Sequence, residues 1–244
     1  MQSYIRSTAL KNIINAKKHV INGEEYQNIP ELLLKIAKRP ALIELLQPDC
    51  LRMIHGDLHF QNILVGMSPA ENDIPFILAD PRGEIAGSDV YYDLGKLWHS
   101  FHGLYDFLHT DQFSVSIDFL DGSTVDAGLH MNNADILSTY KNIYKKMHAL
   151  ITQYPLIKND TNWELRTLFS EAMHFSSVMP FHIKNDGYDK RAVALYLTGV
   201  RILNEFVELA NLSRWSEQNC IYNINSLEDY HNMLKYYETI GLSL

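Results

Sequence analysis

The chain contains little cysteine, and the cysteines it has are far apart. Cys50 and Cys220 are the two cysteines among 244 residues, and no Cys-x-x-Cys motif occurs. Two cysteines are too few for a disulfide framework of the kind that small secreted domains use. We therefore expect a reduced, cytoplasmic protein.

Long apolar runs and an excess of positive charge are also absent. No stretch approaches the roughly 18 consecutive apolar residues of a transmembrane helix. Residues 1–18 carry Arg6, Lys11, Lys17 and Lys18 without a continuous apolar segment, which is unlike a signal peptide. The chain has 21 Lys and Arg against 29 Asp and Glu, a net charge of −8. We therefore expect neither a membrane nor nucleic acid as a partner.

Internal repeats, low-complexity tracts and linker-like segments do not occur in the sequence. Apolar residues make up 46% and charged residues 20% of the chain, as in ordinary globular proteins. A chain of 244 residues is long enough to bury a sizeable core. We therefore expect one domain that spans residues 1–244.

Apolar periodicity predicts a mostly helical chain. Pro30 stands where a helix begins, and Pro40 breaks that helix before a further short one at 41–46. The Asn22-Gly23 pair is interpreted as the end of the first helix. The remaining helices are expected at 3–20, 89–109, 132–153, 162–177, 189–212 and 226–239.

A few short strands interrupt the helical pattern. Short apolar runs between turn residues predict strands at 51–55, 63–65 and 74–79, with a loop at 80–83. Apolar and polar residues alternate on both sides of the Asp121-Gly122 turn, which predicts a β-hairpin over 113–119 and 125–129. The expected fold class is therefore α+β and mostly helical, with short strands around loops and one β-hairpin.

Three polar residues at the ends of these short strands form a candidate site. Asp57 follows the first strand beside Gly56, which permits a sharp bend of the backbone. Asn62 precedes the second strand, and Asp80 follows the third. Strand ends that lie side by side would bring the three together. A carboxylate can orient or deprotonate a hydroxyl, while an amide oxygen and a second carboxylate suit Mg²⁺, a division that phosphoryl transfer requires.

The segment 55–62, His-Gly-Asp-Leu-His-Phe-Gln-Asn, resembles the catalytic loop of the aminoglycoside phosphotransferase and choline kinase family. The resemblance continues through Asp-Pro-Arg-Gly at 80–83 and Asp-Val-Tyr-Tyr-Asp-Leu-Gly at 89–95. These three motifs lie in the family's order within residues 51–98, and the helical tail at 132–244 has the texture of the family's C-terminal lobe. The resemblance implies the C-terminal lobe of the protein-kinase-like fold.

The same resemblance implies a reaction. The γ-phosphoryl of ATP or GTP would move to a hydroxyl of a small acceptor, such as a sugar, an amino alcohol or an aminoglycoside. Asp57 would be the catalytic base or would orient that hydroxyl. Asn62 and Asp80 would hold Mg²⁺ as the cofactor.

Four further residues have supporting roles under this resemblance. His55 would pack beneath the loop, and His59 would orient Asp57 or contact the substrate. Asp93 would brace the loop through hydrogen bonds. Arg82 would offer its charge to phosphate or to an acidic substrate.

The family's N-terminal lobe has no counterpart in this interpretation. Only helices are predicted ahead of residue 51, and no Gly-x-Gly-x-x-Gly segment occurs. We therefore expect a C-terminal lobe without its nucleotide lid, with a second chain or a dimer partner supplying the missing lobe. The alternative function is that of a non-catalytic or partner-dependent lobe acting as a binding module.

Other interpretations of these residues stay open. His55, Asp57 and His59 alternate as in a transition-metal site, and the same loop is similar to metallophosphoesterase loops, although no Gly-Asn-His segment is present. The three strand-end residues also suit turns and helix caps. Aromatic residues at helical spacing over 91–107 are expected mostly in the core, and Glu171 is expected on a solvated face.

Overall fold

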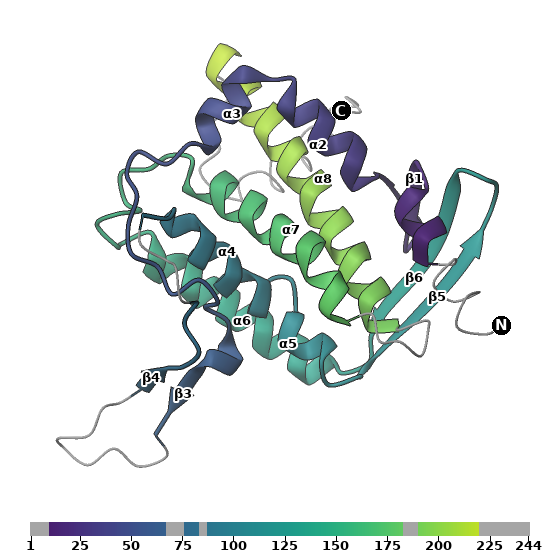
Figure 1. Ribbon diagram of the computed structural model, residues 1–244, viewed down its shortest axis with the longest axis horizontal. Helices are drawn as coiled ribbons and strands as arrows, with labels where there is room; N and C mark the ends of the chain where they lie inside the picture. The colour runs from purple at the N-terminus through teal and green to yellow at the C-terminus, as the bar shows by residue number, and fades with distance from the viewer. Residues whose placement is uncertain (1–9, 67–75, 83–86, 183–189, 220–244) are drawn as a thin grey trace.

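The computed structural model describes residues 10–66, 76–82, 87–182 and 190–219. It shows an α+β protein in which two long helices, α7 and α8, lie side by side at the centre (Figure 1). Helix α4 packs against α7, and helix α2 packs against α8. The helices are α2 Ile29–Ala37, α3 Pro40–Leu46, α4 Val90–Phe101, α5 Tyr105–Leu108, α6 Ala134–Ile151, α7 Trp163–His182 and α8 Lys190–Asn219.

The core is built around α8, in which residues 192–200 are all buried. A helix that is surrounded on all sides needs an apolar surface all round. A second cluster, centred on Trp98, joins α4 to the start of α7. Gly95 allows α4 and α7 to approach closely, because a Cβ there would lie 2.5 Å from the Cβ of Ser170. The aromatic residues over 91–107 are buried as expected, except that Tyr92 is half-buried.

Most of the predicted helices are confirmed, including those set by proline. Helix α2 has a proline in its first turn, and the Asn28 side chain caps it by accepting from the backbone of Glu31 at 3.0 Å. The helix predicted at 89–109 is interrupted, because Leu104 adopts a left-handed φ of 62° between α4 and α5. The helix predicted at 226–239 lies outside the described residues. No helix in the described part of the chain is long and apolar enough to cross a membrane.

A four-stranded sheet lies at one end of the helical core, with strand order β2-β1-β6-β5 (Figure 1). Its strands are β1 Lys18–Ile21, β2 Glu24–Gln27, β5 Phe113–Phe119 and β6 Thr124–Met131. The β5–β6 pair confirms the predicted hairpin. Strand β1 pairs with β6 in parallel, and this pairing joins the start of the chain to its middle.

The helix predicted at 3–20 is wrong beyond residue 15, and the expectation of only helices ahead of residue 51 is wrong as well. Residues 10–15 are helical and 3–9 lie outside the described residues, but Lys18–Ile21 forms β1. The Asn22-Gly23 pair is a hairpin turn, with φ of 54° and 89°. Pairing with β6 overrides the local helical pattern, so the sheet holds two hairpins where one was expected.

A separate two-stranded sheet projects from the opposite end of the molecule (Figure 1). Its strands, β3 Ile63–Val65 and β4 Phe76–Leu78, confirm the predicted strand at 63–65 and part of that at 74–79. The strand predicted at 51–55 is wrong, because there the backbone forms one isolated bridge, between Arg52 and Ser88. Residues 80–82 form the predicted loop, and residue 83 lies outside the described residues.

Glu171 is fully buried, which corrects the expectation of a solvated face. Its carboxylate lies 2.8 Å from His102 Nδ1. Burial alone would lower the pKa of His102, but the Glu171 carboxylate raises it to about 9. Burial raises the pKa of Glu171 in turn, and His102, the residue after α4, forms a buried ion pair with Glu171 on α7.

Candidate functional site

The loop at 55–62 is held by one carboxylate of helix α4. Asp93 is 9% exposed, and its two oxygens accept hydrogen bonds from the backbone N–H groups of His55 at 2.6 Å and Gly56 at 2.8 Å. Gly56 has a φ of 82°, a conformation that favours glycine. The Asp93 carboxylate therefore fixes the bend that precedes Asp57, as the sequence interpretation expected of it.

Asn62 ties the end of the loop back to its centre. The loop closes with a short 3₁₀ turn, Phe60–Asn62. The Asn62 amide nitrogen donates to the backbone oxygen of Asp57 at 2.9 Å and lies 3.5 Å from its Oδ2. The Ser100 hydroxyl on α4 accepts from the backbone of Phe60 at 3.0 Å. These bonds keep the side chains of Asp57 and Asn62 close together.

The small sheet brings the Asp80 loop to the same place. Ile63 pairs with Leu78, and the backbone N–H of Ala79 donates to the Asn62 carbonyl at 2.8 Å. Asp80 follows directly, is exposed, and has a left-handed φ of 54°. Among the described residues, no hydrogen bond joins the Asp80 side chain to Asn62 or Asp57, so the backbone bond between Ala79 and Asn62 is what holds the two loops together here.

Arg82 and His55 link the two loops. The backbone N–H of Arg82 donates to the His55 carbonyl at 2.9 Å, and the Arg82 guanidinium donates to the Tyr92 hydroxyl at 2.9 Å. The His55 ring is half-buried beneath the loop and accepts from the backbone N–H of Asp57 at 3.3 Å. Arg82 therefore keeps its charge near the site while remaining exposed.

Lys96 is a site residue that the sequence interpretation missed. It lies one helical turn after Asp93 and is 8% exposed, and its ammonium is 3.1 Å from Asp57 Oδ1. Burial raises the pKa of the Asp57 carboxyl, but Lys96, with smaller contributions from His59 and Arg82, leaves the pKa below its usual value. Asp57 is therefore ionised at neutral pH. The signal in the sequence is a lysine within the apolar stretch that follows Asp93.

Asp106 is a second residue that the sequence interpretation missed. His59 lies between two carboxylates, with Nε2 3.7 Å from Asp57 Oδ2 and Nδ1 4.0 Å from Asp106 Oδ1. Both Asp106 oxygens are buried and have no hydrogen-bond partner among the described residues. Burial lowers the pKa of His59, although Asp57 opposes this, so the imidazole is neutral at pH 7. A neutral ring in this position can orient the Asp57 carboxylate.

Residues 55–59 do not form the strand that a transition-metal site would need. In the described parts of the chain, no group of three or more His, Cys, Asp and Glu residues could hold a metal ion. An Mg²⁺ site differs, because Mg²⁺ takes one or two protein carboxylates and fills its other positions with water and phosphate oxygens.

Replacing Lys96 by methionine is expected to raise the pKa of Asp57, because burial then acts without the ammonium that offsets it. A carboxyl with a lowered folded-state pKa stabilises the fold above its unfolded pKa, and this contribution is lost as the pH falls through the folded-state pKa. The free energy of unfolding should therefore fall by about 2 kcal/mol at neutral pH. The difference in stability from the unsubstituted chain should shrink below about pH 4. Urea unfolding of both proteins at neutral pH and below about pH 4 would measure this.

The matched background for this measurement is Asp57→Asn, in which the carboxylate is already absent. There, Lys96→Met should have a smaller effect on stability, with little dependence on pH. An equal loss in both backgrounds would show that Lys96 acts through packing and not through its charge on Asp57.

The arrangement as a whole places an ionised carboxylate and an amide on one loop, with a buried ammonium from α4 against the carboxylate and an exposed second carboxylate on the neighbouring loop. It can orient a hydroxyl and offset negative charge. Comparisons of the chain with protein-family models, curated proteins and solved structures found no match.

Proposed function

We propose that this chain is a small-molecule phosphotransferase, which moves the γ-phosphoryl of ATP or GTP to a hydroxyl of a sugar, an amino alcohol or an aminoglycoside-like acceptor. The observation that carries the proposal is the convergence of Asp57, Asn62 and the Asp80 loop, with Asp93 bracing the backbone. The resemblance of segments 55–62, 80–83 and 89–95 to the aminoglycoside phosphotransferase and choline kinase family supports it. The helical core would then be the C-terminal lobe of a protein-kinase-like fold.

Asp57 would receive the acceptor hydroxyl. Its lowered pKa makes it a weak base, so its main contribution is to orient the oxygen and to take the proton late in the transfer. His59 lies between Asp57 and Asp106 and would help to hold the Asp57 carboxylate in place. Lys96 keeps Asp57 ionised, so that the carboxylate can accept a hydrogen bond from the acceptor hydroxyl.

Asn62 and Asp80 fit a bound Mg²⁺. The Asn62 amide nitrogen is committed to Asp57, which leaves its oxygen as the available ligand atom. Asp80, whose side chain is exposed, directly follows Ala79, and the backbone N–H of Ala79 donates to the Asn62 carbonyl. These are hard oxygen donors of the type that Mg²⁺ prefers. When bound, the ion would neutralise phosphate charge.

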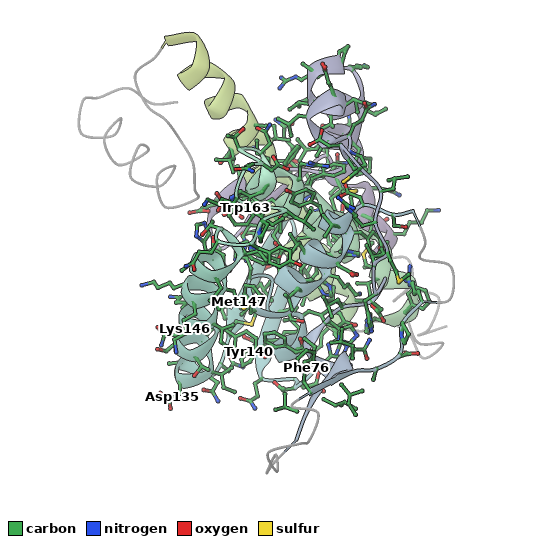
Figure 2. All side chains as sticks on the ribbon, turned by 90° about the vertical axis from the view of Figure 1, so that its left-hand side faces the viewer. Phe76, Asp135, Tyr140, Lys146, Met147 and Trp163 are labelled. Atoms are coloured by element: carbon green, nitrogen blue, oxygen red, sulfur yellow. The ribbon has the colours of Figure 1, made fainter. Side chains whose placement is uncertain are left out.

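A second candidate function is favoured by the surface of the small sheet. Leu64, Val65, Phe76, Ile77 and Leu78 are between 44% and 71% exposed. Figure 2 labels Phe76 on this projecting pair of strands, and Phe76 pairs with Val65 at the end farther from Asn62. A group of five exposed apolar side chains on one small sheet favours a partner protein that binds over them. The chain would then be a partner-dependent lobe, or a binding module, whose missing lid comes from a second chain or a dimer partner.

Calorimetric titration of the chain with ATP and with GTP tests the phosphotransferase proposal. Binding is expected to require Mg²⁺ and to weaken about tenfold or more in Asp80→Ala, since one metal ligand is lost. Asp118→Ala, which removes an exposed carboxylate from β5, is the matched control and should bind normally. Equal binding by Asp80→Ala would contradict the metal assignment. Absence of binding by the unsubstituted chain would favour the partner-dependent lobe.

A further inference from the structure

A large cavity lies away from the loop at 55–62 and has no role in the proposed transfer. Its volume is about 810 Å³, within the range of sites that hold small molecules. The β1–β2 hairpin, strand β6, the end of α4, and helices α6 and α8 form its walls. Residues from separate parts of the chain therefore meet at a concave surface that the reaction leaves unused.

The cavity is lined by cations on two facing helices. Lys141 and Lys145 lie one turn apart on α6, and Arg201 comes from α8. No carboxylate within the described residues forms an ion pair with any of the three. Lysines at this spacing repel each other on a helix. A chain with a net charge of −8 thus places three cations around one cavity.

The other lining groups suit the organic part of a ligand. Glu24, the carboxylate among the described lining residues, accepts a hydrogen bond of 2.5 Å from the Tyr26 hydroxyl. Tyr144 supplies aromatic surface, because Phe101 is itself buried, and His102 is held by its ion pair with Glu171. Apolar and aromatic walls with a few convergent polar groups are typical of metabolite sites.

The orientation of α6, and with it the position of these lysines, is set by other residues of the helix that pack against the core. Tyr140 and Met147 pack against the cluster around Trp98. Figure 2 shows both on the side of α6 toward the body of the molecule, with Asp135 and Lys146 at its outer edge. Lys146 does not line the cavity, although it is the next residue after Lys145. The chain therefore offers a neighbouring lysine as an internal control.

We propose that this cavity binds a metabolite-sized anion, with phosphate or carboxylate groups held by Lys141, Lys145 and Arg201. The guanidinium can hold two oxygens of one such group, and the lysines act as point charges beside it. A sugar or ring attached to the anionic group packs on Tyr144. This binding site is independent of the proposed phosphotransferase site and does not require its activity.

Pyrophosphate and citrate, titrated calorimetrically into the full chain in the presence of EDTA, are the probes. The expected result is saturable binding of at least one probe at one site per chain. Tighter binding of pyrophosphate would assign phosphate as the preferred group, and tighter binding of citrate would assign carboxylate. Arg201→Gln and the double variant Lys141→Gln/Lys145→Gln should each weaken binding about tenfold or more, because each removes charge-assisted hydrogen bonds.

Two control variants establish whether the probe binds in this cavity. Lys141, Lys145, Arg201 and Lys146 are all exposed, but Lys146 does not line the cavity, so Lys146→Gln should change the dissociation constant less than about twofold. Asp80→Ala should bind the probe normally, which separates this result from any failure of the nucleotide site. The proposal is overturned if neither probe saturates, if the cavity variants bind normally, or if Lys146→Gln weakens binding as much as they do. Circular dichroism confirms that each variant is folded.

Discussion

Asp57→Asn is expected to lower kcat for phosphoryl transfer by roughly 10²- to 10⁴-fold, the usual contribution of a positioned acid–base group. The amide cannot accept the proton of the acceptor hydroxyl. The fold should survive, because one side-chain oxygen remains to accept from Lys96, whose ammonium lies 3.1 Å from the carboxylate in the unsubstituted chain. The expected result is therefore a folded, nucleotide-binding and nearly inactive protein.

The measurement is release of ADP or GDP with an acceptor chosen from a screen of sugars and amino alcohols. Nucleotide affinity is measured in parallel by calorimetry, so that loss of chemistry is distinguished from loss of binding. Asp118→Asn, an exposed carboxylate on β5, is the matched control and should retain full activity. Unchanged transfer by Asp57→Asn would show that the assignment of Asp57 as base is wrong.

Asp93→Ala is expected to lower the free energy of unfolding by about 3 kcal/mol or more. Its carboxylate is 9% exposed and accepts from two backbone N–H groups, those of His55 and Gly56. Removing it leaves both donors without their partner, and a bond to a charged group contributes about 1.5 to 3 kcal/mol. Because the same bonds fix the bend before Asp57, Mg²⁺-nucleotide binding should weaken as well.

Urea unfolding of the variant, with the slope on denaturant checked for constancy, measures the loss in stability. Asp93→Asn keeps one acceptor oxygen and should lie between Asp93→Ala and the unsubstituted chain. Asp118→Ala should change the free energy of unfolding by less than about 0.5 kcal/mol, as exposed substitutions usually do. If Asp93→Ala were as stable as the unsubstituted chain, the carboxylate would have no part in holding the loop.

Local signals in the sequence were sufficient for the elements whose pattern and partners lie close together. The hairpin β5–β6 is such a case, because alternation and the Asp121-Gly122 turn both lie within it. Helices α2 and α3 begin where proline fixes the backbone, so Pro30 and Pro40 marked them. The interrupted helix after Phe101 was missed, since a left-handed leucine leaves no compositional signal.

The candidate site could be predicted in part. The positions of Asn62 and Asp80 at strand ends came from the pattern of short apolar runs, whereas the strand expected before Asp57 does not form. The role of Asp93 as the brace came from the family resemblance. Lys96 and Asp106 did not, because a charged residue on a helix is interpreted as solvated unless its burial is known. The ion pair of His102 with Glu171 was hidden for the same reason, since its partners lie on different helices.

The sequence by itself determined the α+β class, most helices, both short strands of the small sheet, and the loop at 55–62. Tertiary structure alone decided that Lys18–Ile21 is a strand, because its parallel partner β6 lies about a hundred residues away and local periodicity carries no information about partners. It also decided which charges are buried and which surround the cavity between α6 and α8. Burial depends on what packs against a side chain, and packing is set by the whole fold.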